Sequence, residues 1–435
     1  MKLKDIIEEY ISGDWGNEDL SPETPCAVYC VRGADIVPIS NDQFNDIPLR
    51  YISTRAKDNK TLKAGDLVIE KSGGSPIQST GRIAYISQEL IDSKGSLVCS
   101  NFCISIRIKD TWNPKFVYYF WQYIYNTGVF FNFEGKTSGL KNLQFDNAIA
   151  SIDIPEYTLA QQSKIADILS KLEYKMTVNR EINRNLEEMA RQLYDYWFVQ
   201  FDFPNENGRP YKLSGGKMVW NEKLKRDIPE GWSHTTIERY ANIQNGATPS
   251  TSDEANYGGD IVWITPKDLS DQSQKFTFRG ERSITDKGYN SCSTTLLPKG
   301  TVLMSSRAPI GLLSIAAIDL CTNQGFKSLV PKHESEQRFL YYIVDQFLPF
   351  IKQMGSGTTF SEVSKDELAK LKVPDVPSNI IDQWNSKVEP IFRRQKLILK
   401  ETDTLSTQRD ELLPLLMNGQ VSLMPPEVNC DLSHD

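Results

Sequence analysis

The spacing of hydrophobic residues changes character twice along this chain of 435 residues. Over residues 1–157, and again over 231–377, short apolar runs and alternating apolar and polar residues predict buried and half-buried strands. Over 158–201 and 378–419, apolar residues recur in steps of three and four, which predicts two long helices. The chain is therefore expected to place a long helix after a globular domain, twice.

The two globular segments repeat the same landmarks in the same order. Residues 62–74 and 297–307 each predict a turn at a glycine, Gly65 or Gly300, followed by a buried strand and a small-residue loop that carries a cation. Four later landmarks also recur. A Cys-Ser-Asn or Cys-Thr-Asn run stands at 99–101 and 321–323, and an aromatic-rich helix is expected at 115–120 and 338–343. A Gly/Ser/Thr loop follows at 135–139 and 355–359, and a strand ends at a proline at 154–155 and 373–374. The pattern predicts an internal repeat of about 219 residues.

The two predicted helices carry matched apolar seams. A shift of 219 residues superimposes Ile165 on Trp384, Leu172 on Ile391, Leu186 on Leu405 and Leu193 on Leu412. Together with Trp197, these residues are the expected helix-pair or subunit interface. Two helices of ~64 Å, at ~1.5 Å per residue, bury such seams most simply by pairing antiparallel, whereas packing against a domain core is the alternative. Pro390 predicts a kink or an early break in the second helix.

These patterns indicate an α+β protein with a pseudo-two-fold internal repeat, in which two similar globular α/β domains are separated by a pair of long antiparallel coiled-coil-like helices. The expected segments are a first globular domain, a central helix, an irregular linker, a second globular domain, a distal helix and a tail: 1–157, 158–201, 202–230, 231–377, 378–419 and 420–435.

Composition narrows the class of protein. The 49 Lys and Arg against 56 Asp and Glu leave a net charge of −7, which by itself neither requires nor excludes an anionic partner, because a ligand meets only one face. No apolar run approaches the ~18 residues of a membrane helix, and the first residues lack the apolar core of a signal peptide. Seven cysteines and three histidines do not form a disulfide framework or a histidine metal cluster. We expect a cytoplasmic protein that binds no metal and no membrane.

Several enzyme signatures are absent. Gly135-Lys136-Thr137 ends like a phosphate-binding loop, but Phe130 stands where that loop requires glycine. Neither a methyltransferase Asn-Pro-Pro-Tyr or Asp-Pro-Pro-Tyr run nor a dinucleotide-binding Gly-x-Gly-x-x-Gly loop occurs. The pairs Cys26/Cys30 and Cys99/Cys103 have the spacing of two residues on one face of a strand, which favours packing over zinc. We therefore expect no catalytic residues in this chain.

Loops that combine glycine, small hydroxyls and a cation recur in both halves. Such loops let backbone N–H groups approach phosphate, while Ser, Thr, Lys and Arg donate to phosphate oxygens or base edges. They are equally compatible with solvated turns. The loops are 71–75 and 136–139 in the first half, and 305–307 and 355–359 in the second.

Five further segments carry a family resemblance. They are Leu-Ala-Gln-Gln-Ser-Lys-Ile-Ala-Asp-Ile-Leu at 159–169, the stretch 183–199, Ile-Pro-Glu-Gly-Trp at 228–232, Trp-Ile-Thr-Pro-Lys-Asp-Leu at 263–269, and Leu-Leu-Pro-Leu-Leu-Met-Asn-Gly-Gln-Val at 412–421. With them the chain resembles, over nearly all its length, the specificity (S) subunit of type I restriction–modification systems. The start of the second helix, 378–385, lacks the paired glutamines of the first, and the domain entry at 13–16 departs from the family's Pro-x-Gly-Trp.

The resemblance implies that the globular domains are target-recognition domains, each recognising one half of a split, asymmetric double-stranded DNA sequence. It further implies that the helices set the gap between half-sites and dock two methyltransferase (M) subunits, which restriction/translocase (R) subunits join. S-adenosylmethionine, ATP and Mg²⁺ are expected on those partners, and no cofactor on this chain. The chain would contribute specificity and no catalysis.

Candidate DNA-contacting residues follow from the loops and the resemblance together: Lys71, Ser72, Arg82, Lys136, Ser138 and Lys141 in the first domain, and Thr248, Thr265, Lys267, Arg307, Asn323, Ser356 and Thr358 in the second. Two other classes of function stay open. A nuclease or fused modification enzyme would require activity in the isolated chain. A DNA mimic or scaffold without base-specific binding would require a uniformly negative face.

Overall fold

A computed structural model of the chain describes residues 1–73, 78–137, 140–272, 274–355 and 362–421. The chain forms two compact units: unit 1 comprises residues 1–179 together with the chain from Glu401 onward, and unit 2 comprises 180–400. Each long helix is therefore divided between the two units. The helices complete the hydrophobic cores of the units and do not form separate domains between them.

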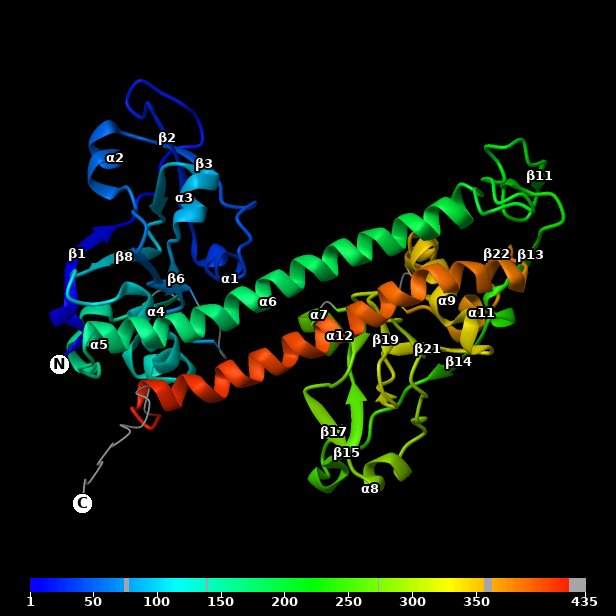
Figure 1. Cartoon of the computed structure of the whole chain (residues 1–435). Coiled ribbons are helices and arrows are strands. Elements are labelled where there is room, and N and C mark those ends of the chain that lie inside the picture. Colours follow the sequence, from blue (N-terminus) through cyan, green and yellow to red (C-terminus); the bar gives the residue numbers. More distant parts are fainter. Residues whose placement is uncertain (74–77, 138–139, 273, 356–361, 422–435) are drawn as a thin grey trace, which may run out of the picture. The chain divides into compact units, whose positions relative to one another are not determined.

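Unit 1 contains three small sheets (Figure 1). The largest has the antiparallel order β1-β8-β4-β6, the second pairs β2 with β3 antiparallel and with β7 parallel, and the third has the order β5-β10-β9. Their bounds are β1 (Ile7–Ser12), β2 (Cys26–Val31), β3 (Leu49–Ile52), β4 (Leu67–Glu70), β5 (Ser72–Gly73), β6 (Ile83–Tyr85), β7 (Leu97–Cys99), β8 (Cys103–Ile108), β9 (Glu134–Thr137) and β10 (Leu140–Leu143). The short helices are α1 (Ile36–Ser40), α2 (Thr54–Lys60), α3 (Gln88–Lys94), α4 (Pro114–Asn126) and α5 (Phe145–Ser151).

Unit 2 has a five-stranded sheet, β14-β21-β18-β19-β16, and a three-stranded sheet, β17-β15-β20. The strands are β13 (Ser233–Thr236), β14 (Ala241–Asn245), β15 (Tyr257–Ile264), β16 (Phe276–Thr277), β17 (Arg282–Ile284), β18 (Val302–Ser305), β19 (Leu313–Ala316), β20 (Cys321–Thr322), β21 (Phe326–Pro331) and β22 (Lys372–Asp375), with β13 paired to β22. The helices are α7 (Pro266–Gln272), α8 (Asp286–Asn290), α9 (Gln337–Gln346), α10 (Leu348–Met354) and α11 (Lys365–Ala369).

The two units share one topology. In each, a long middle strand, β2 or β15, pairs antiparallel with one neighbour and parallel with a strand that leads into the larger sheet. The orders β1-β8-β4-β6 and β14-β21-β18-β19 also correspond, and β16 is an addition of unit 2. The aromatic helices α4 and α9 follow the equivalent strands β8 and β21, as the sequence landmarks predicted. The internal repeat is confirmed.

The long helices are α6 (Leu159–Tyr194), which continues as a π-helical turn over Asp195–Val199, and α12 (Ser378–Met417). In unit 1, the start of α6 shares a hydrophobic cluster with the end of α12, for example Ile165 with Leu416. At the end of the unit 1 part of each helix, the buried side chain of Asn179 donates to the Glu401 carboxylate at 2.9 Å. The first part of α6 therefore lies against the last part of α12, which is an antiparallel order.

Unit 2 shows the same order with the other halves of the helices. Tyr194, the last residue of α6, and Phe198, in the π-helical turn that follows, contact Trp384 near the start of α12, with ring centroids 6.1 and 5.5 Å away. Helix α12 runs through Pro390 without interruption, so the break predicted there does not occur. No helix among the described residues has the length and apolarity needed to span a bilayer.

Residues 202–230 are more ordered than an irregular linker. They contain the hairpin β11 (Met218–Asn221) and β12 (Arg226–Pro229). Phe201 and Phe203 are buried against Trp232, at centroid distances of 5.6 and 5.2 Å. The buried aromatic rings thus hold this segment in place. Its many glycine and proline residues had indicated an irregular linker.

The cysteine pairs differ in placement. Cys26 and Cys30 lie on the same strand, β2, as predicted, but Cys99 ends β7 whereas Cys103 begins β8. Burial raises the pKa of Cys30 to about 12 and that of Cys103 to about 11. All of these thiols are free.

Candidate nucleic-acid interface

The candidate residues of unit 2 gather at one end of its sheets. We call this group the unit 2 loop cluster, defined as residues 246–248, 265–267, 305–307 and 322–325. Backbone hydrogen bonds join its segments: Ala247 N–H donates to Thr322 at 3.0 Å, Asn323 N–H to Ile264 at 3.0 Å, and Ser306 N–H to Gly325 at 2.7 Å. Thr248, Thr265, Lys267, Arg307 and Asn323, which are far apart in sequence, therefore belong to one surface.

Unit 1 builds an equivalent group from different residues. The unit 1 loop cluster is defined as residues 71–73, 100–102 and 140–143. The N–H groups of Lys71 and Ser72 donate to the carbonyl of Phe102 at 2.8 and 3.1 Å, and Leu143 N–H donates to Lys71 at 2.7 Å. In unit 2 the corresponding bond joins Val363 N–H to Ser306 at 2.9 Å. In each unit, a backbone hydrogen bond therefore joins the residue after a central strand, Lys71 or Ser306, to a residue that follows the second glycine-rich segment, Leu143 or Val363.

The structure aligns the Cys-Ser-Asn run at 99–101 with the Cys-Thr-Asn run at 321–323 in a register shifted by one residue from the sequence alignment. Ser100 N–H donates to Val31 at 2.9 Å, and it is Asn323 N–H that makes the same bond, to Ile264, in unit 2. Asn323 is thus the counterpart of Ser100, and Phe102 is the counterpart of Gly325. Sequence similarity alone had paired Asn101 with Asn323.

Arg82 is held inside unit 1. Its Nε and Nη2 atoms donate to the carboxylate of Glu70 at 2.9 and 2.6 Å, and the Glu70 side chain is only 3% exposed. The hydrogen bond to Glu70 raises the pKa of Arg82, although burial opposes the shift. Gly73 lies against the same carboxylate, since a Cβ there would come within 2.5 Å of Glu70 Oε1. Arg82 acts as a structural partner of Glu70 beneath the loop cluster.

Two further predicted cations, Lys141 and Lys267, also have carboxylate neighbours. Lys141 Nζ lies 2.9 Å from Glu134 and 4.8 Å from the ring centre of Phe131. In unit 2, the exposed Lys267 pairs with Glu281 at 2.7 Å. Lys71 is half-buried and forms no ion pair within the described residues. Neutralised cations attract DNA phosphate less strongly, so several predicted contacts are partly satisfied within the chain.

Arg307 shares one acceptor with a buried lysine. Its Nε donates to Glu362 at 3.0 Å, and Lys327 Nζ donates to the other oxygen of that carboxylate at 3.0 Å. Burial alone would raise the pKa of Glu362, but the hydrogen bonds and charges of Lys327 and Arg307 outweigh it and lower the pKa. Half of the Arg307 side-chain surface is still exposed.

The polar candidates of unit 2 shape its turns. Thr265 Oγ1 donates to Asp268 at 2.6 Å, ahead of α7, and Thr248 bonds to Gln324. Asn323 Oδ1 accepts from Gly325 N–H at 2.9 Å, which leaves the Asn323 NH₂ group without an acceptor among the described residues. An amide NH₂ at such a position is suited to a base edge or a phosphate.

Four predicted contacts have no described side chain. Ser138, Ser356 and Thr358 lie outside the described residues, and only the backbone of Lys136 is described. That backbone belongs to β9, which pairs with β10 and places Lys136 opposite Lys141. The segment predicted as a loop from Gly135 is therefore a strand as far as Thr137.

Phe102 is a candidate contact that the sequence analysis missed. Its side chain is 57% exposed, at the centre of the unit 1 loop cluster, while its carbonyl is held by two N–H donors. A large exposed aromatic on a fixed turn resembles the apolar wedges and stacking platforms of DNA-binding proteins. Its position directly after the repeated Cys-Ser-Asn run is the sequence feature that could have identified Phe102 as a candidate.

The predicted interface residues of the helices lie in or beside the hydrophobic cores. Ile165 is buried in unit 1, and Trp197, Trp384 and Ile391 are buried in unit 2. The remaining five are half-buried: Leu172, Leu186, Leu193, Leu405 and Leu412. The buried members hold the helices within each unit and are not free to meet another subunit.

The chain is a duplicated α+β protein, built from two units of one topology. Each unit has a polar loop cluster and is completed by halves of two long helices. A family model described as type I restriction modification DNA specificity domain matches residues 35–188 and 229–412. The chain belongs to this family, which confirms the resemblance predicted from its sequence.

Individual relatives agree with this assignment. The chain is 38% identical over 164 residues to the type I restriction enzyme MjaIX specificity subunit of Methanocaldococcus jannaschii, a match that spans 36% of this chain and only 38% of that protein. It is 25% identical over 340 residues to the HindI specificity subunit of Haemophilus influenzae, covering 66% of this chain and 73% of the relative.

A solved structure has the same fold. The crystal structure of a type I restriction–modification S subunit from M. genitalium superimposes with a TM-score of 0.57 at 15% sequence identity, over 96% of this chain and 95% of that one. The α+β fold with two domains and long linking helices is thereby confirmed.

Proposed function

We propose that this chain is the specificity subunit of a type I restriction–modification complex, and that each loop cluster recognises one half of a split, asymmetric DNA target. One observation carries the proposal: the same backbone hydrogen-bond pattern forms both loop clusters, while the side chains on that pattern differ. A shared scaffold with different polar groups is what recognition of two different half-sites requires.

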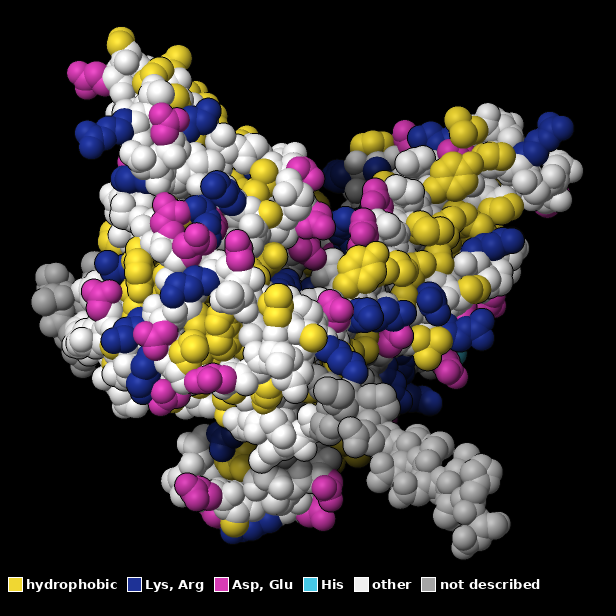
Figure 2. All heavy atoms as spheres, turned by 60° about the vertical axis from the view of Figure 1, so that its left-hand side comes forward, with side chains coloured by type: hydrophobic (Ala, Val, Ile, Leu, Met, Phe, Trp, Pro, Cys, Tyr) yellow, Lys and Arg dark blue, Asp and Glu magenta, His cyan; other side chains and the backbone are white. Residues whose placement is uncertain are grey.

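The chemistry of the clusters supports contact with DNA. Unit 2 offers Arg307, the free amide donors of Asn323 and small hydroxyls, and unit 1 offers Lys71 and the exposed ring of Phe102. On the face seen in Figure 2, Lys and Arg side chains are interspersed with Asp and Glu. That pattern differs from the uniformly negative face expected of a DNA mimic.

The lengths of the helices are suited to setting the distance between the two half-sites. The 36 residues of α6 and the 40 of α12 correspond to ~54 and ~60 Å at ~1.5 Å per residue. One turn of B-DNA measures ~34 Å, so helices of this length match a separation of one to two turns. In this proposal the helix length sets the unread gap between the half-sites.

The proposal assigns chemistry to partners. Two methyltransferase subunits would dock on the helices and adjoining surfaces and supply S-adenosylmethionine. Restriction/translocase subunits would supply ATP-driven translocation and cleavage with Mg²⁺. This chain would hold no catalytic group, and phosphate contacts from the partners would offset its net charge of −7.

The direct test is modified-base sequencing of genomic DNA from cells that express the methyltransferase partner with and without this chain. We expect a new split, asymmetric motif with adenine methylated in both halves, present only with the chain. Exchanging residues 71–73 and 100–102 for those of a relative should change one half of the motif and leave the other half intact.

Two outcomes would contradict the proposal. If the partner and this chain co-purify and no motif appears, the scaffold or DNA-mimic function is favoured. If the isolated chain cleaves or methylates DNA, it is an enzyme in its own right.

A further inference from the structure

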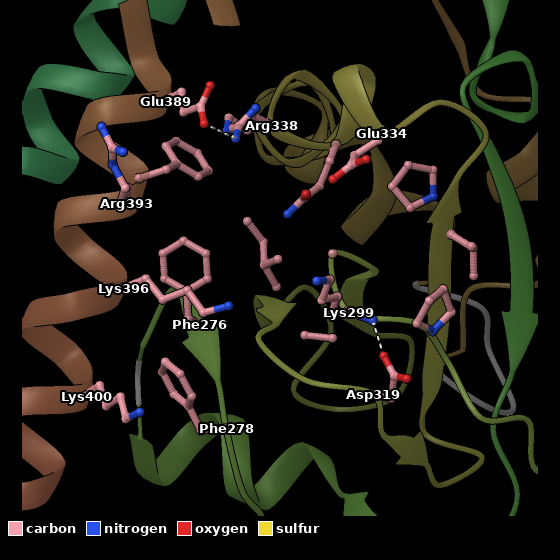
Figure 3. A pocket seen from close by; sticks show the side chains of 18 of the residues that line it. Phe276, Phe278, Lys299, Asp319, Glu334, Arg338, Glu389, Arg393, Lys396 and Lys400 are labelled. Atoms are coloured by element: carbon pink, nitrogen blue, oxygen red, sulfur yellow. Dashed lines mark hydrogen bonds and ion pairs between the residues drawn. The ribbon is translucent and has the colours of Figure 1, made fainter. Parts of the chain in front are cut away.

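Unit 2 contains a pocket that the proposed DNA recognition does not use. It has a volume of about 810 Å³, within the usual range for ligand sites, and is lined by the ends of β16, β19 and β21, the start of α9 and one face of α12 (Figure 3). Gly300 lines it just before β18, whereas Arg307 follows β18. The pocket and the unit 2 loop cluster therefore lie at opposite ends of the same strand.

The lining combines aromatic rings with excess positive charge. Phe276, Phe278 and Phe392 form an apolar wall. Five cationic residues line the pocket: Lys299, Arg338, Arg393, Lys396 and Lys400. Three acidic residues accompany them: Asp319, Glu334 and Glu389. An aromatic wall beside clustered cations is the lining expected for an anion that carries a flat ring.

Two of the three acids are already engaged. Glu389 lies 3.8 Å from Arg338, and Asp319 accepts the backbone N–H of Lys299 at 2.8 Å. No carboxylate within the described residues forms an ion pair with the side chains of Lys299, Arg393 or Lys396.

Lys396 stands in an unfavourable position for a cation. Its Nζ donates to the carbonyl of Ala317 at 2.9 Å and lies 5.9 Å from the ring centre of Phe278. Burial, followed by the like charge of Lys299, lowers the pKa of Lys396. An anion between the two ammonium groups would remove that repulsion.

Helix α9 adds to the positive potential. It has ten residues, and the side chains of Gln337 and Arg338 in its first turn line the pocket. The unpaired N–H groups of a helix start carry partial positive charge and attract anions.

The residues that line the pocket differ from those at the equivalent positions of unit 1. Among the described residues of unit 1, no strand of the larger sheet corresponds to β16, the strand that supplies Phe276. The position equivalent to Arg338 is occupied by Lys115, whose Nζ lies 4.4 Å from the ring centre of Tyr85 and 5.1 Å from that of Tyr118. A shared fold thus does not require this pocket, since in unit 1 the lysine turns onto the aromatic rings.

We propose that the pocket binds a nucleoside polyphosphate, with its phosphates between Lys299 and Lys396 and its base against Phe278. The proposal concerns binding only and is independent of DNA recognition by the loop clusters.

The test is calorimetric titration of the full chain with ATP, pyrophosphate and adenosine, without divalent cations. We expect ATP to bind with a Kd on the order of 10–100 μM, pyrophosphate more weakly, and adenosine at least tenfold more weakly than ATP. Lys396→Met should weaken ATP binding at least tenfold. Lys223→Met, which removes an exposed lysine of the β11–β12 turn, is the matched control and should leave it unchanged.

Three results would overturn the proposal. The first is no heat with ATP or pyrophosphate at millimolar concentration, and the second is an unchanged ATP affinity in both Lys396→Met and Arg393→Met. The third is displacement of bound ATP by an unrelated short DNA duplex, which would assign the phosphate site to DNA. Circular dichroism and the unfolding midpoint check that the variants fold. The methylation motif of Lys396→Met, expected to be that of the parent chain, separates failure of this site from failure of the proposed function.

Discussion

Arg307 and Glu362 are held together at the edge of the unit 2 loop cluster, with the Arg307 Nε 3.0 Å from the carboxylate. The register pairs the two residues as an isolated antiparallel bridge, and the 8% exposed side chain of Lys327 binds the same carboxylate. One acid therefore balances two cations. The arrangement keeps a net positive charge at a surface where the proposed DNA would lie.

Removing either partner should change DNA binding in opposite directions. Arg307→Ala is expected to weaken binding and to reduce the slope of log K against log salt by about 1, because one phosphate contact is lost. Glu362→Gln should increase the slope, since the exposed Arg307 loses its carboxylate partner, and should cost about 1–3 kcal/mol in the free energy of unfolding, because the buried Lys327 loses its acceptor. The measurement is a salt series of binding isotherms with the methylation complex.

The matched control for this experiment is Glu222→Gln, which frees the exposed Lys225 of the β11–β12 turn, outside both loop clusters, from its pair and should leave binding and its salt slope unchanged. Charge removal at Lys136, opposite Lys141 in unit 1, should act like Arg307→Ala. Unchanged affinity and unchanged salt slopes in both Lys136→Ala and Arg307→Ala would exclude the β9–β10 pair of unit 1 and Arg307 of the unit 2 loop cluster from the interface.

Phe102→Ala should weaken recognition of one half-site only. The residue at the equivalent position of unit 2 is Gly325, which has no ring to place against a base. Loss of base stacking costs about 1–3 kcal/mol, which is a roughly 5- to 150-fold loss of affinity. Fluorescence of 2-aminopurine placed along each half-site reports unstacking, and an equal response in both half-sites would contradict this role.

Arg82→Met is expected to destabilise unit 1 by about 3 kcal/mol, because it leaves the buried carboxylate of Glu70 without its partner. The double variant Glu70→Met/Arg82→Met removes both charges and should recover most of that stability. If the double variant also recovers DNA affinity, Arg82 has a structural role. If it folds like the parent and still fails to bind, Arg82 contacts DNA directly.

Lys275 gives unit 2 a pH-dependent stability. Its side chain is buried and pairs with Glu187 of α6, and burial lowers its pKa from 10.5 to about 8. Between those values the unfolded chain binds more protons than the folded chain, so the free energy of unfolding rises with pH. Lys275→Met should show a smaller rise between pH 8 and pH 10. Denaturant unfolding of both proteins at several pH values measures the difference, and identical pH profiles would contradict it.

The sequence predicted the architecture well because its signals are local. A period of three to four residues and a repeated order of turns, strands and an aromatic helix locate α6, α12, α4 and α9 without knowledge of the tertiary structure. The division of each helix between two units was missed, because apolar seams do not specify which surface covers them. The hairpin at 218–229 was missed for a related reason, since aromatic packing by Phe201 and Phe203 outweighs the many turn-forming residues.

The DNA contacts stay a prediction. Glycine and small hydroxyls marked segments that the fold brings together at one end of the sheets, but the partners of individual cations depend on contacts that no spacing reveals. Arg82 illustrates this, because its acceptor Glu70 is an acid at the end of a strand whose other residues are apolar. An exposed phenylalanine such as Phe102 is likewise indistinguishable in sequence from a core residue.

The division of the helices also determines the order in which the chain can fold during synthesis. Residues 159–179 emerge from the ribosome long before 401–417, yet unit 1 needs both to cover Ile165 and Leu169. Such remote contacts form late, and exposed apolar surface must wait for them. A premature stop codon shortly before Glu401 would therefore harm the unit translated first, while unit 2 would already have all its residues.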